Sequence, residues 1–326
     1  MLVITFLIFA VSLALLLKGS DMFVDAAAHF SETLGISKSA FAVTVVAFAT
    51  SIPELGTGIV AAFQKNSNII LGNVVGSNIA NIGLILGLIA LFLVTKKRQR
   101  EFVHETQFLL LVSIAFFLLS IDGSIAWPEA VILLLLGVLY SRHILHKGQH
   151  HHAHARLRTE RSASVHRQSS NTNHLNKQWA IIAVLGLAAV YLGAQYTISS
   201  LIDVASELHM SQVVASMIFL AVGTSLPELT VSFTALKKGL RTLAVGNLIG
   251  SNIMNLLAVA GVAGLISPII IDKASLFFTL PYMILLTILL YRYVTLKGWF
   301  SRVLEGLLLL SAYAVFLVLL VLGHML

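Results

Sequence analysis

The stretch "FATSIPELGTG", residues 48–58, places a proline and a glutamate in the middle of a run that otherwise reads as a membrane-spanning helix. The same words return at residues 221–231 as "AVGTSLPELTV", with Pro227 and Glu228 in the matching places. An acidic side chain at the centre of a bilayer costs at least about 2.5 kcal/mol on insertion scales. Two such acids in two copies of one phrase therefore need a common explanation.

The composition around these phrases is that of a membrane protein. The chain has 326 residues, of which 58% are hydrophobic and 11% are charged, whereas a soluble domain carries about 25% charged residues. Residues 66–95 and 242–271 contain no Asp, Glu, Lys or Arg, and each run is longer than the roughly 18 apolar residues that indicate a spanning helix. We therefore expect an all-α polytopic membrane protein. A transmembrane barrel would instead show alternating segments of about ten residues.

The hydrophobic runs predict ten transmembrane helices. The first run has no basic segment and no A-x-A cleavage signal, so we expect a retained helix there rather than a signal peptide. The absence of cysteine excludes disulfides and thiolate metal sites. The approximate cores of the ten spans are 2–17, 39–64, 68–94, 106–121, 125–145, 179–200, 211–236, 242–267, 274–294 and 303–323.

The basic residues are sorted by side of the membrane. A net charge of +7 would by itself suggest a nucleic-acid partner. With ten spans, however, 19 of the 21 Lys and Arg residues fall on one side, and only Lys65 and Lys273 fall on the other. This is the positive-inside asymmetry of a multi-pass protein of the plasma membrane or bacterial inner membrane, with the lipid bilayer and not a nucleic acid as its partner. It predicts that both termini lie outside the cytoplasm.

An internal repeat is the strongest feature of the sequence. Glu54 and Glu228 are 174 residues apart, and aligning 49–81 with 223–255 needs no gap and matches 13 of 33 positions. Five predicted helices separate the copies, and because five is odd the copies cross the membrane in opposite directions. Inverted repeats are a recurrent plan of secondary transporters, which bind substrate near the midplane where the halves meet.

These repeats predict the organisation of the whole chain. We expect a first five-helix repeat over residues 1–145, with its motif at 44–88. The second five-helix repeat would cover 179–326, with its motif at 218–262. A cytoplasmic His-rich linker, residues 146–178, would join the two.

Each proline is expected to open its helix. Pro53 cannot donate a hydrogen bond to the carbonyl of Ala49, and Pro227 cannot donate one to the carbonyl of Gly223. Freed carbonyls at membrane depth need a cavity or a cation to satisfy them. Carboxylate, hydroxyl and amide groups recur beside them in both halves, and such oxygen ligands are those that Na⁺ and Ca²⁺ prefer. A divalent cation would neutralise both glutamates at once.

Other interpretations of these residues remain open. A membrane proline can simply kink its helix, Ser and Thr can bond back to their own helix, and the glutamates can make structural hydrogen bonds. The motif glycines either open the helix or let helices pack closely; they are Gly72, Gly76, Gly246 and Gly250. Four asparagines lie on other faces of their helices and are expected to bond between helices; they are Asn73, Asn78, Asn247 and Asn252.

The paired segments closely resemble the alpha repeats of the cation/calcium exchanger superfamily, specifically its prokaryotic sodium/calcium antiporter branch. The matching words are "ATSIPE" with "GNVVGSNIANIGLILG", and "GTSLPE" with "GNLIGSNIMN". The resemblance implies an antiporter of Ca²⁺ against Na⁺ that works by alternating access, with no cofactor and no catalytic site. Helices 2, 3, 7 and 8 would form its core, and helices 1 and 6 would slide past that core. By analogy the ion ligands would be the side chains of Thr50, Ser51, Glu54, Ser77, Asn81, Thr224, Ser225, Glu228, Ser251 and Asn255, with the backbone carbonyls of Ala47 and Ala221.

The chain departs from the family pattern at two positions. In the family a glycine usually precedes "TS", and Gly223 is that glycine in the second half. In the first half Ala49 stands in its place, and it would slightly stiffen the first broken turn. Some relatives carry an aspartate where this chain has Asn255. Two acidic ligands instead of three remain here, so the resemblance does not give the ion stoichiometry.

Alternatives also remain for the linker and for the function. Eight of the 12 histidines lie between His143 and His174, which allows metal capture or pH sensing, although the composition favours a solvated, disordered linker. Ca²⁺/H⁺ exchange is an alternative because glutamates carry protons, and a cation channel is another. An intramembrane enzyme is not expected, since neither H-E-x-x-H nor G-x-S-x-G occurs.

Overall fold

The computed structural model describes residues 2–92, 100–160, 172–207, 225–295 and 299–325. These residues are helical except for short connections and one antiparallel pair of two-residue strands. The predicted all-α class is therefore confirmed.

Several helices of the first half are interrupted, and π-helical turns separate their parts. The elements of this half are α1 (Leu2–Thr33), α2 (Lys38–Phe41), η1 (Ala42–Val46), α3 (Ala47–Thr50), α4 (Ile52–Phe63), α5 (Ser67–Leu71), η2 (Gly72–Gly76), α6 (Ser77–Ala80), η3 (Asn81–Leu86), α7 (Gly87–Phe92), η4 (Arg100–Phe102), α8 (Val103–Leu119), β1 (Ser124–Ile125) and α9 (Trp127–Glu160).

The second half follows the same order. Its described elements are α10 (Thr172–Glu207), α12 (Leu226–Lys237), α13 (Arg241–Met254), η5 (Asn255–Val259), α14 (Ala260–Ile266), β2 (Ile269–Ile270), η6 (Ser275–Thr279), α15 (Leu280–Thr295) and α16 (Trp299–Met325).

The described helices account for the predicted number of spans. Seven are long and apolar enough to cross a membrane, or eight if the bent pair 38–50 and 52–63 counts as one span. α8 is a shorter apolar helix. The predicted span 211–236 falls partly on residues 208–224, which lie outside the described part of the chain, and continues as α12.

The linker differs from the prediction. α9 continues to Glu160 and α10 begins at Thr172, so helix covers most of residues 146–178, where a disordered chain was expected. Residues 161–171 lie outside the described part of the chain. Extending an existing helix avoids the cost of nucleation, and no proline occurs between Pro128 and Pro227 to stop it.

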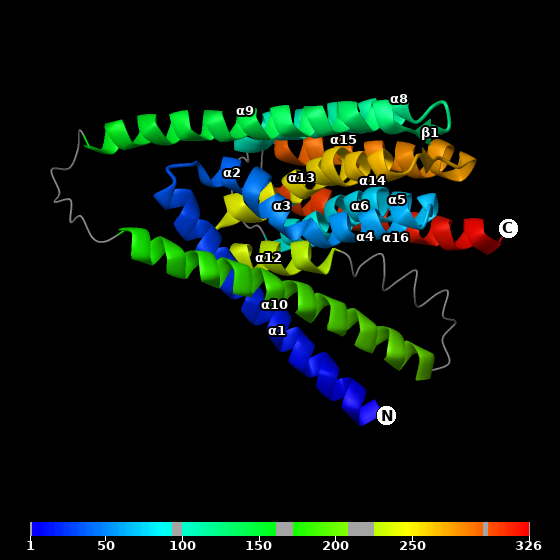
Figure 1. Ribbon diagram of the computed structural model, residues 1–326, viewed down its shortest axis with the longest axis horizontal. Coiled ribbons are helices and arrows are strands. Elements are labelled where there is room, and N and C mark those ends of the chain that lie inside the picture. The colour runs from blue at the N-terminus through cyan, green and yellow to red at the C-terminus, as the bar shows by residue number, and fades with distance from the viewer. Residues whose placement is uncertain (1, 93–99, 161–171, 208–224, 296–298, 326) are drawn as a thin grey trace.

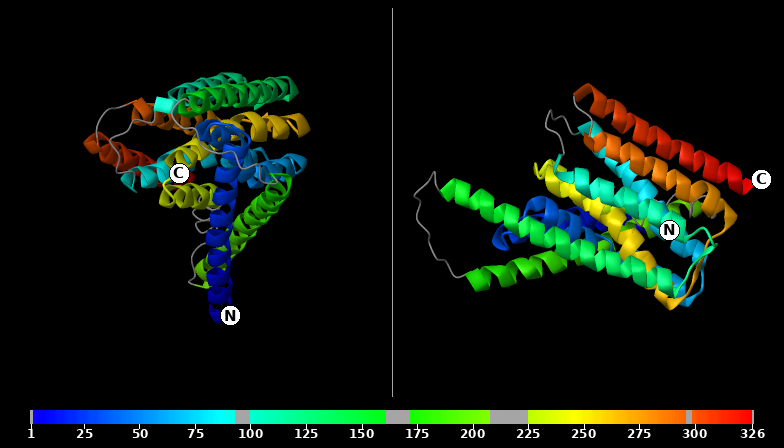
Figure 2. Two further views of the ribbon diagram at one scale, coloured as in Figure 1. Left: turned by 90° about the vertical axis from the view of Figure 1, so that its left-hand side faces the viewer. Right: turned by 90° about the horizontal axis from the view of Figure 1, so that it is seen from above.

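Figures 1 and 2 show α1 and α10 crossing each other beside a bundle formed by the other helices. The motif helices α5–α7 and α13–α14 lie inside that bundle and are mostly buried, whereas α1, α9 and α10 leave much of their surface exposed. The sequence segments that repeat are therefore the buried core of the molecule.

The crossing of α1 and α10 preserves the repeat register. A Cβ atom added at Gly19 would lie 2.8 Å from the backbone nitrogen of Val190, and one added at Gly193 would lie 2.5 Å from the backbone nitrogen of Leu16. Gly19 and Gly193 are 174 residues apart, and so are Leu16 and Val190. The two-fold relation between the halves therefore extends to this peripheral pair.

The motif glycines of the second half pack closely against another helix. A Cβ atom at Gly250 would lie 2.2 Å from the carbonyl oxygen of Val43 and 2.6 Å from the Cβ atom of Ala47. For these glycines the close-packing interpretation is confirmed. At Gly76, the equivalent of Gly250, no described atom lies within 4 Å. The equivalents of Val43 and Ala47 fall within residues 208–224, outside the described part of the chain.

A short antiparallel strand pair, β1 and β2, connects the two halves at one end of the molecule. Ser124 pairs with Ile270 and Ile125 pairs with Ile269, and the Ile270 N–H donates a hydrogen bond to Ser67 Oγ at 2.9 Å. Figure 1 shows the C-terminus at this end, whereas the C-terminal end of α9 and the N-terminal end of α10 lie at the opposite end.

Candidate ion-binding site

Both repeated phrases break their helices at equivalent residues. Ser51 has φ −87° and ψ 8° between α3 and α4, and Ser225 has φ −91° and ψ 6° before α12. The two parts of the first broken helix are bent by 46°. Each proline therefore stands in the first turn of a new helix, where its missing N–H removes no intrahelical bond.

The break places each glutamate at the start of a half-helix. Glu54 lies in the first turn of α4 and Glu228 in the first turn of α12. The free N–H groups and the dipole of a helix N-terminus stabilise negative charge. Within a membrane, this arrangement reduces the cost of keeping the two carboxylates ionised.

The two carboxyl groups are buried and short of partners. Glu54 is 0% exposed and Glu228 is 1% exposed, and the two are close enough for their charges to interact. Within the described part of the chain, neither carboxyl oxygen of Glu54 accepts a hydrogen bond, and neither does Glu228 Oε2. Glu228 Oε1 is 3.5 Å from Ser251 Oγ. Buried charges in proteins are normally paired or bind ions, so these two require a counter-charge.

Hydroxyl groups from both halves meet at Glu228. Thr50 Oγ1 lies 3.2 Å from Ser251 Oγ, and it donates to Asn247 Oδ1 at 3.0 Å and to the Ala47 carbonyl at 3.2 Å. Thr50, Ser251 and Glu228 are all buried. The first broken helix thus contributes directly to the surroundings of the second acid.

Two amides add oxygen atoms to this region. Asn81 Nδ2 donates to Asn252 Oδ1 at 3.3 Å, and Asn255 Nδ2 donates to Asn78 Oδ1 at 3.1 Å. The two pairs are equivalent by the internal repeat, because Asn81 and Asn255 are 174 residues apart and so are Asn78 and Asn252. In each ligand amide the nitrogen is engaged, and Oδ1 accepts no hydrogen bond within the described residues.

Seven oxygen atoms on the predicted ligands are therefore buried without a hydrogen-bond donor among the described residues. Such an array is unfavourable by itself and matches the preference of Na⁺ and Ca²⁺ for several oxygen ligands. Among described residues, no cluster of three or more His, Asp or Glu side chains could hold a metal, so hydroxyl and amide oxygens must supplement the carboxylates. The buried oxygen atoms for which no hydrogen-bond donor is found include Glu54 Oε1 and Oε2, Glu228 Oε2, Asn81 Oδ1, Asn255 Oδ1, Ser51 Oγ and Ser225 Oγ.

The remaining predicted ligands are placed as follows. Ser77 is buried on α6, one helical turn before Asn81. Ala47 begins α3, and its carbonyl accepts the Thr50 hydroxyl. Thr224 and Ala221 lie outside the described residues.

The four other motif asparagines bond between helices, as expected. Asn73 Nδ2 donates to the Glu54 carbonyl at 2.7 Å, and Asn247 Nδ2 donates to Ser232 Oγ at 3.0 Å. Asn78 and Asn252 bond to the ligand amides themselves. Residue spacing separated these asparagines from the ligand face, but it gave no sign that two of them contact ligands.

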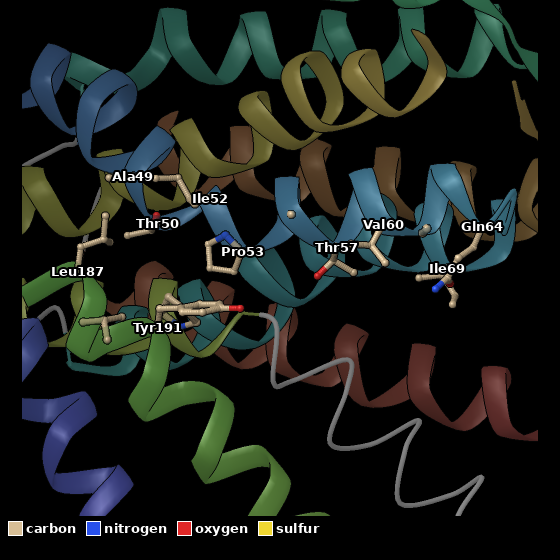
Figure 3. Close-up of a pocket in the computed structure, with 14 residues that line it drawn as sticks. Ala49, Thr50, Ile52, Pro53, Thr57, Val60, Gln64, Ile69, Leu187 and Tyr191 are labelled. Carbon is tan, nitrogen blue, oxygen red and sulfur yellow. The ribbon is translucent and has the colours of Figure 1, made fainter. Parts of the chain in front are cut away.

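A cavity leads to the site from one end of the molecule. It has a volume of about 710 Å³ and extends along α4 from Gln64 to Thr50 and Pro227. Figure 3 shows the ring of Tyr191, on α10, across the cavity from Pro53. Most of its lining is apolar, and its inner end reaches the break in the first motif helix.

Comparison with known proteins identifies relatives along the whole chain. Residues 4–144 and 178–322 match the sequence model for sodium/calcium exchanger proteins. Sodium/calcium exchanger MaX1 of Methanosarcina acetivorans is 33% identical over 348 residues, which cover 98% of this chain and 99% of that protein. Inner membrane protein YrbG of Escherichia coli is 29% identical over 284 residues, covering 86% of this chain and 85% of its own length.

The fold is also similar to a solved structure. The sodium-calcium exchanger NCX_Mj, soaked with 10 mM Na⁺ and zero Ca²⁺, superposes with a TM-score of 0.81 and 28% sequence identity. The match covers 98% of this chain and 99% of NCX_Mj. The two-halved, inverted-repeat architecture is therefore shared.

Proposed function

The chain belongs to the sodium/calcium exchanger family, a family of membrane transporters and not of enzymes, and we propose that it exchanges Ca²⁺ for Na⁺ by alternating access. The observation that carries this proposal is the buried set of donor-free oxygen atoms at the junction of the inverted halves. MaX1 and NCX_Mj are both named as sodium/calcium exchangers, which supports the choice of ions. We propose export of Ca²⁺ as the physiological direction.

Charge balance supports exchange at one shared site. With Glu54 and Glu228 ionised, the site holds two negative charges, which one Ca²⁺ or two Na⁺ would balance. A net charge in a low-dielectric centre is costly. Bound Ca²⁺ therefore disfavours binding of Na⁺ at the same time, and bound Na⁺ disfavours binding of Ca²⁺. Because Asn255 is neutral, no third carboxylate is present at that position to balance a further Na⁺.

Transport measurements test the proposal against its alternatives. The purified protein is reconstituted in vesicles, and Ca²⁺ flux is followed with a Na⁺ gradient at equal pH on both sides, then with a pH gradient without Na⁺. Ca²⁺ accumulation driven by Na⁺ supports the proposed exchange. Accumulation driven only by the pH gradient would indicate Ca²⁺/H⁺ exchange, and flux that only dissipates the Ca²⁺ gradient would indicate a channel.

We propose a location in the cytoplasmic membrane with both termini outside the cytoplasm. The charge asymmetry supports this orientation, and YrbG is described as an inner membrane protein. A single cysteine at position 160 in this cysteine-free chain should react with a membrane-impermeant thiol reagent only after the cytoplasmic face is exposed. A cysteine replacing Lys65 should react in intact cells. The reverse pattern would contradict the orientation.

We infer that this structure is the outward-facing state of such a cycle. The cavity that reaches the site has Gln64 at its mouth, at the end of α4 that we place outside. The equivalent of Gln64 in the second half is Lys238, on the cytoplasmic side. There α12 packs against α1, which closes the route as far as the described residues define it.

An ion-pair cluster at the cytoplasmic end of α1 strengthens this closure. Lys238 Nζ lies 2.7 Å from Asp25 Oδ1 and 3.5 Å from Asp21 Oδ1, and it donates to the Asp21 carbonyl at 3.1 Å. The equivalents of these three residues in the other half are uncharged: they are Gln64, Gln195 and Ser199. The cluster therefore breaks the symmetry between the halves and favours the outward-facing state.

Lys238→Gln introduces the residue that the equivalent position, Gln64, has at the mouth of the outer cavity. We expect this variant to favour the inward-facing state. Partly exposed ion pairs contribute about 0.2–1 kcal/mol each, and about 1 kcal/mol in total corresponds to a roughly five-fold population shift. The apparent KM for Ca²⁺ at the cytoplasmic face should fall by up to this factor, as measured in vesicles of defined orientation.

Two further variants separate this effect from local charge. Asp25→Asn changes the charge in the opposite sense but breaks the same cluster, so its KM should also fall. Lys237→Gln removes a neighbouring lysine whose Nζ lies over the Phe233 ring, 5.1 Å from its centroid, and should leave KM unchanged. Equal effects of Lys237→Gln and Lys238→Gln would contradict the assignment.

A further inference from the structure

A chain of hydrogen bonds fixes the orientation of the Asn255 amide. Asn78 Nδ2 donates to the backbone carbonyl of Asn252 at 3.1 Å, and Asn255 Nδ2 donates to Asn78 Oδ1 at 3.1 Å. All three residues are only 1% exposed, so bulk water does not offer them alternative partners.

The direction of this chain follows from its first acceptor. A backbone carbonyl only accepts hydrogen bonds, so the side chain of Asn78 must present its nitrogen to Asn252. Its oxygen then faces Asn255, which must present its own nitrogen in return. Asn255 Oδ1 is thereby left facing away from Asn78, buried and without a donor among the described residues.

The free oxygen of Asn255 belongs to the face that carries the other ligands. Asn255 lies one helical turn after Ser251, and residues four apart share a helix face. Ser251 Oγ is 3.5 Å from Glu228 Oε1 and 3.2 Å from Thr50 Oγ1. The amide oxygen therefore lies on the side of the helix from which a cation at Glu228 would be reached.

An amide ligand must be held in one orientation to present its oxygen to a cation, whereas a carboxylate need not be. The two ends of an amide differ, and a flipped amide would turn two N–H donors toward the cation. The two oxygens of a carboxylate are equivalent. We propose that Asn78 is a positioning residue, which makes Asn255 usable as a cation ligand by holding its oxygen toward the ion; this inference rests on the proposed function.

The equivalent arrangement in the first half is weaker. Asn252 Oδ1 accepts from Asn81 Nδ2 at 3.3 Å, but Asn252 Nδ2 has no hydrogen-bond partner among the described residues. No backbone acceptor therefore fixes the Asn252 amide. The orienting device is complete only for Asn255.

The test is a double-mutant cycle between Asn78→Leu and Asn255→Asp. In the parent protein, Asn78→Leu should raise the apparent KM for Ca²⁺ about ten-fold, the upper range for one orienting hydrogen bond. In the Asn255→Asp background it should change KM less than about three-fold, since a carboxylate needs no orientation. Asn255→Asp alone should make flux more pH-dependent between about pH 6 and 8.5 than in the parent, because a carboxyl group binds a proton and an amide does not.

A structural role for Asn78 would give a different result. Loss of interhelical packing would lower flux and thermal stability equally in both backgrounds, and that outcome would overturn the proposal. Asn78→Ala provides a smaller second variant if Asn78→Leu does not fold. The shift in Tm caused by added Ca²⁺ provides a readout that does not depend on turnover, and it should show the same loss and rescue.

This experiment separates the inference from the function on which it rests. A parent protein without Na⁺-driven Ca²⁺ flux would refute the proposed exchange. A parent with normal flux, combined with equal losses in the two backgrounds, would refute only the role of Asn78.

Discussion

Replacing either Glu54 or Glu228 by glutamine is expected to abolish Ca²⁺ transport while leaving the protein folded. Glutamine keeps the size and shape of the side chain but removes one of two charges that balance a divalent ion. In a buried site this leaves an uncompensated positive charge when Ca²⁺ binds, and such a charge weakens Ca²⁺ binding by several kcal/mol. We therefore expect more than a 100-fold loss of Na⁺-driven Ca²⁺ flux, since about 2.7 kcal/mol already corresponds to that factor.

The same substitutions should not destabilise the ion-free protein. Each removes a buried charge and the repulsion between two nearby carboxylates, so the Tm in the absence of ions should stay constant or rise. Added Ca²⁺ should raise the Tm of the parent but not that of either variant. This combination distinguishes a lost ion ligand from a lost fold.

Glu105 offers a matched control for these two variants. It is also buried, at 8% exposure, and its Oε2 has no hydrogen-bond partner among the described residues. It lines a separate cavity with His104 and Lys147 at the N-terminal end of α8. Glu105→Gln should retain flux within about three-fold, whereas near-normal flux in Glu54→Gln or Glu228→Gln would remove that acid from the site.

The sequence predicted the core of the molecule because its signals there are local or repeated. A proline inside a helical run kinks or breaks the helix, and the structure places the two breaks at Ser51 and Ser225. The constant offset of 174 residues predicted opposite orientations of the halves without any knowledge of tertiary contacts.

Other features depend on contacts that no local pattern specifies. The words "GSN" at 76–78 and 250–252 are identical, yet close packing at Gly250 depends on Val43 and Ala47 of another helix. The difference between Gln64 and Lys238 is visible in the alignment, but its meaning depends on Asp21 and Asp25 of α1. The helical parts of the linker, 146–160 and 172–178, are not predicted because their composition is polar, whereas their conformation follows from α9 and α10, which they extend.

The same dependence on distant contacts determines the expected result of Gly250→Ala. Alanine is favoured over glycine within a helix by about 0.5–1 kcal/mol, so an isolated α13 would gain stability. Overpacking a tight interface costs about 1–3 kcal/mol, and here the added atom would lie 2.2 Å from the Val43 carbonyl oxygen. A backbone carbonyl cannot rotate away as a flexible side chain can, so the cost should exceed the gain.

Relief of this contact requires α13 to move away from η1 and α3. Ser251 is the next residue on α13, and its hydroxyl lies 3.2 Å from Thr50 Oγ1 at the end of α3. Separation of the helices therefore also separates ligands that come from the two halves. We expect Gly250→Ala to lower the Tm by several degrees and to reduce Ca²⁺ flux at least ten-fold.

Gly56→Ala is the control for helix propensity alone. Gly56 is exposed in the middle of α4, and no described atom lies within 4 Å of an added Cβ. Its Tm should stay constant or rise, since the same propensity gain meets no clash. If Gly250→Ala matched Gly56→Ala in Tm and kept normal Ca²⁺ flux, the close approach of α13 to Val43 would not be needed to hold the two halves of the site together.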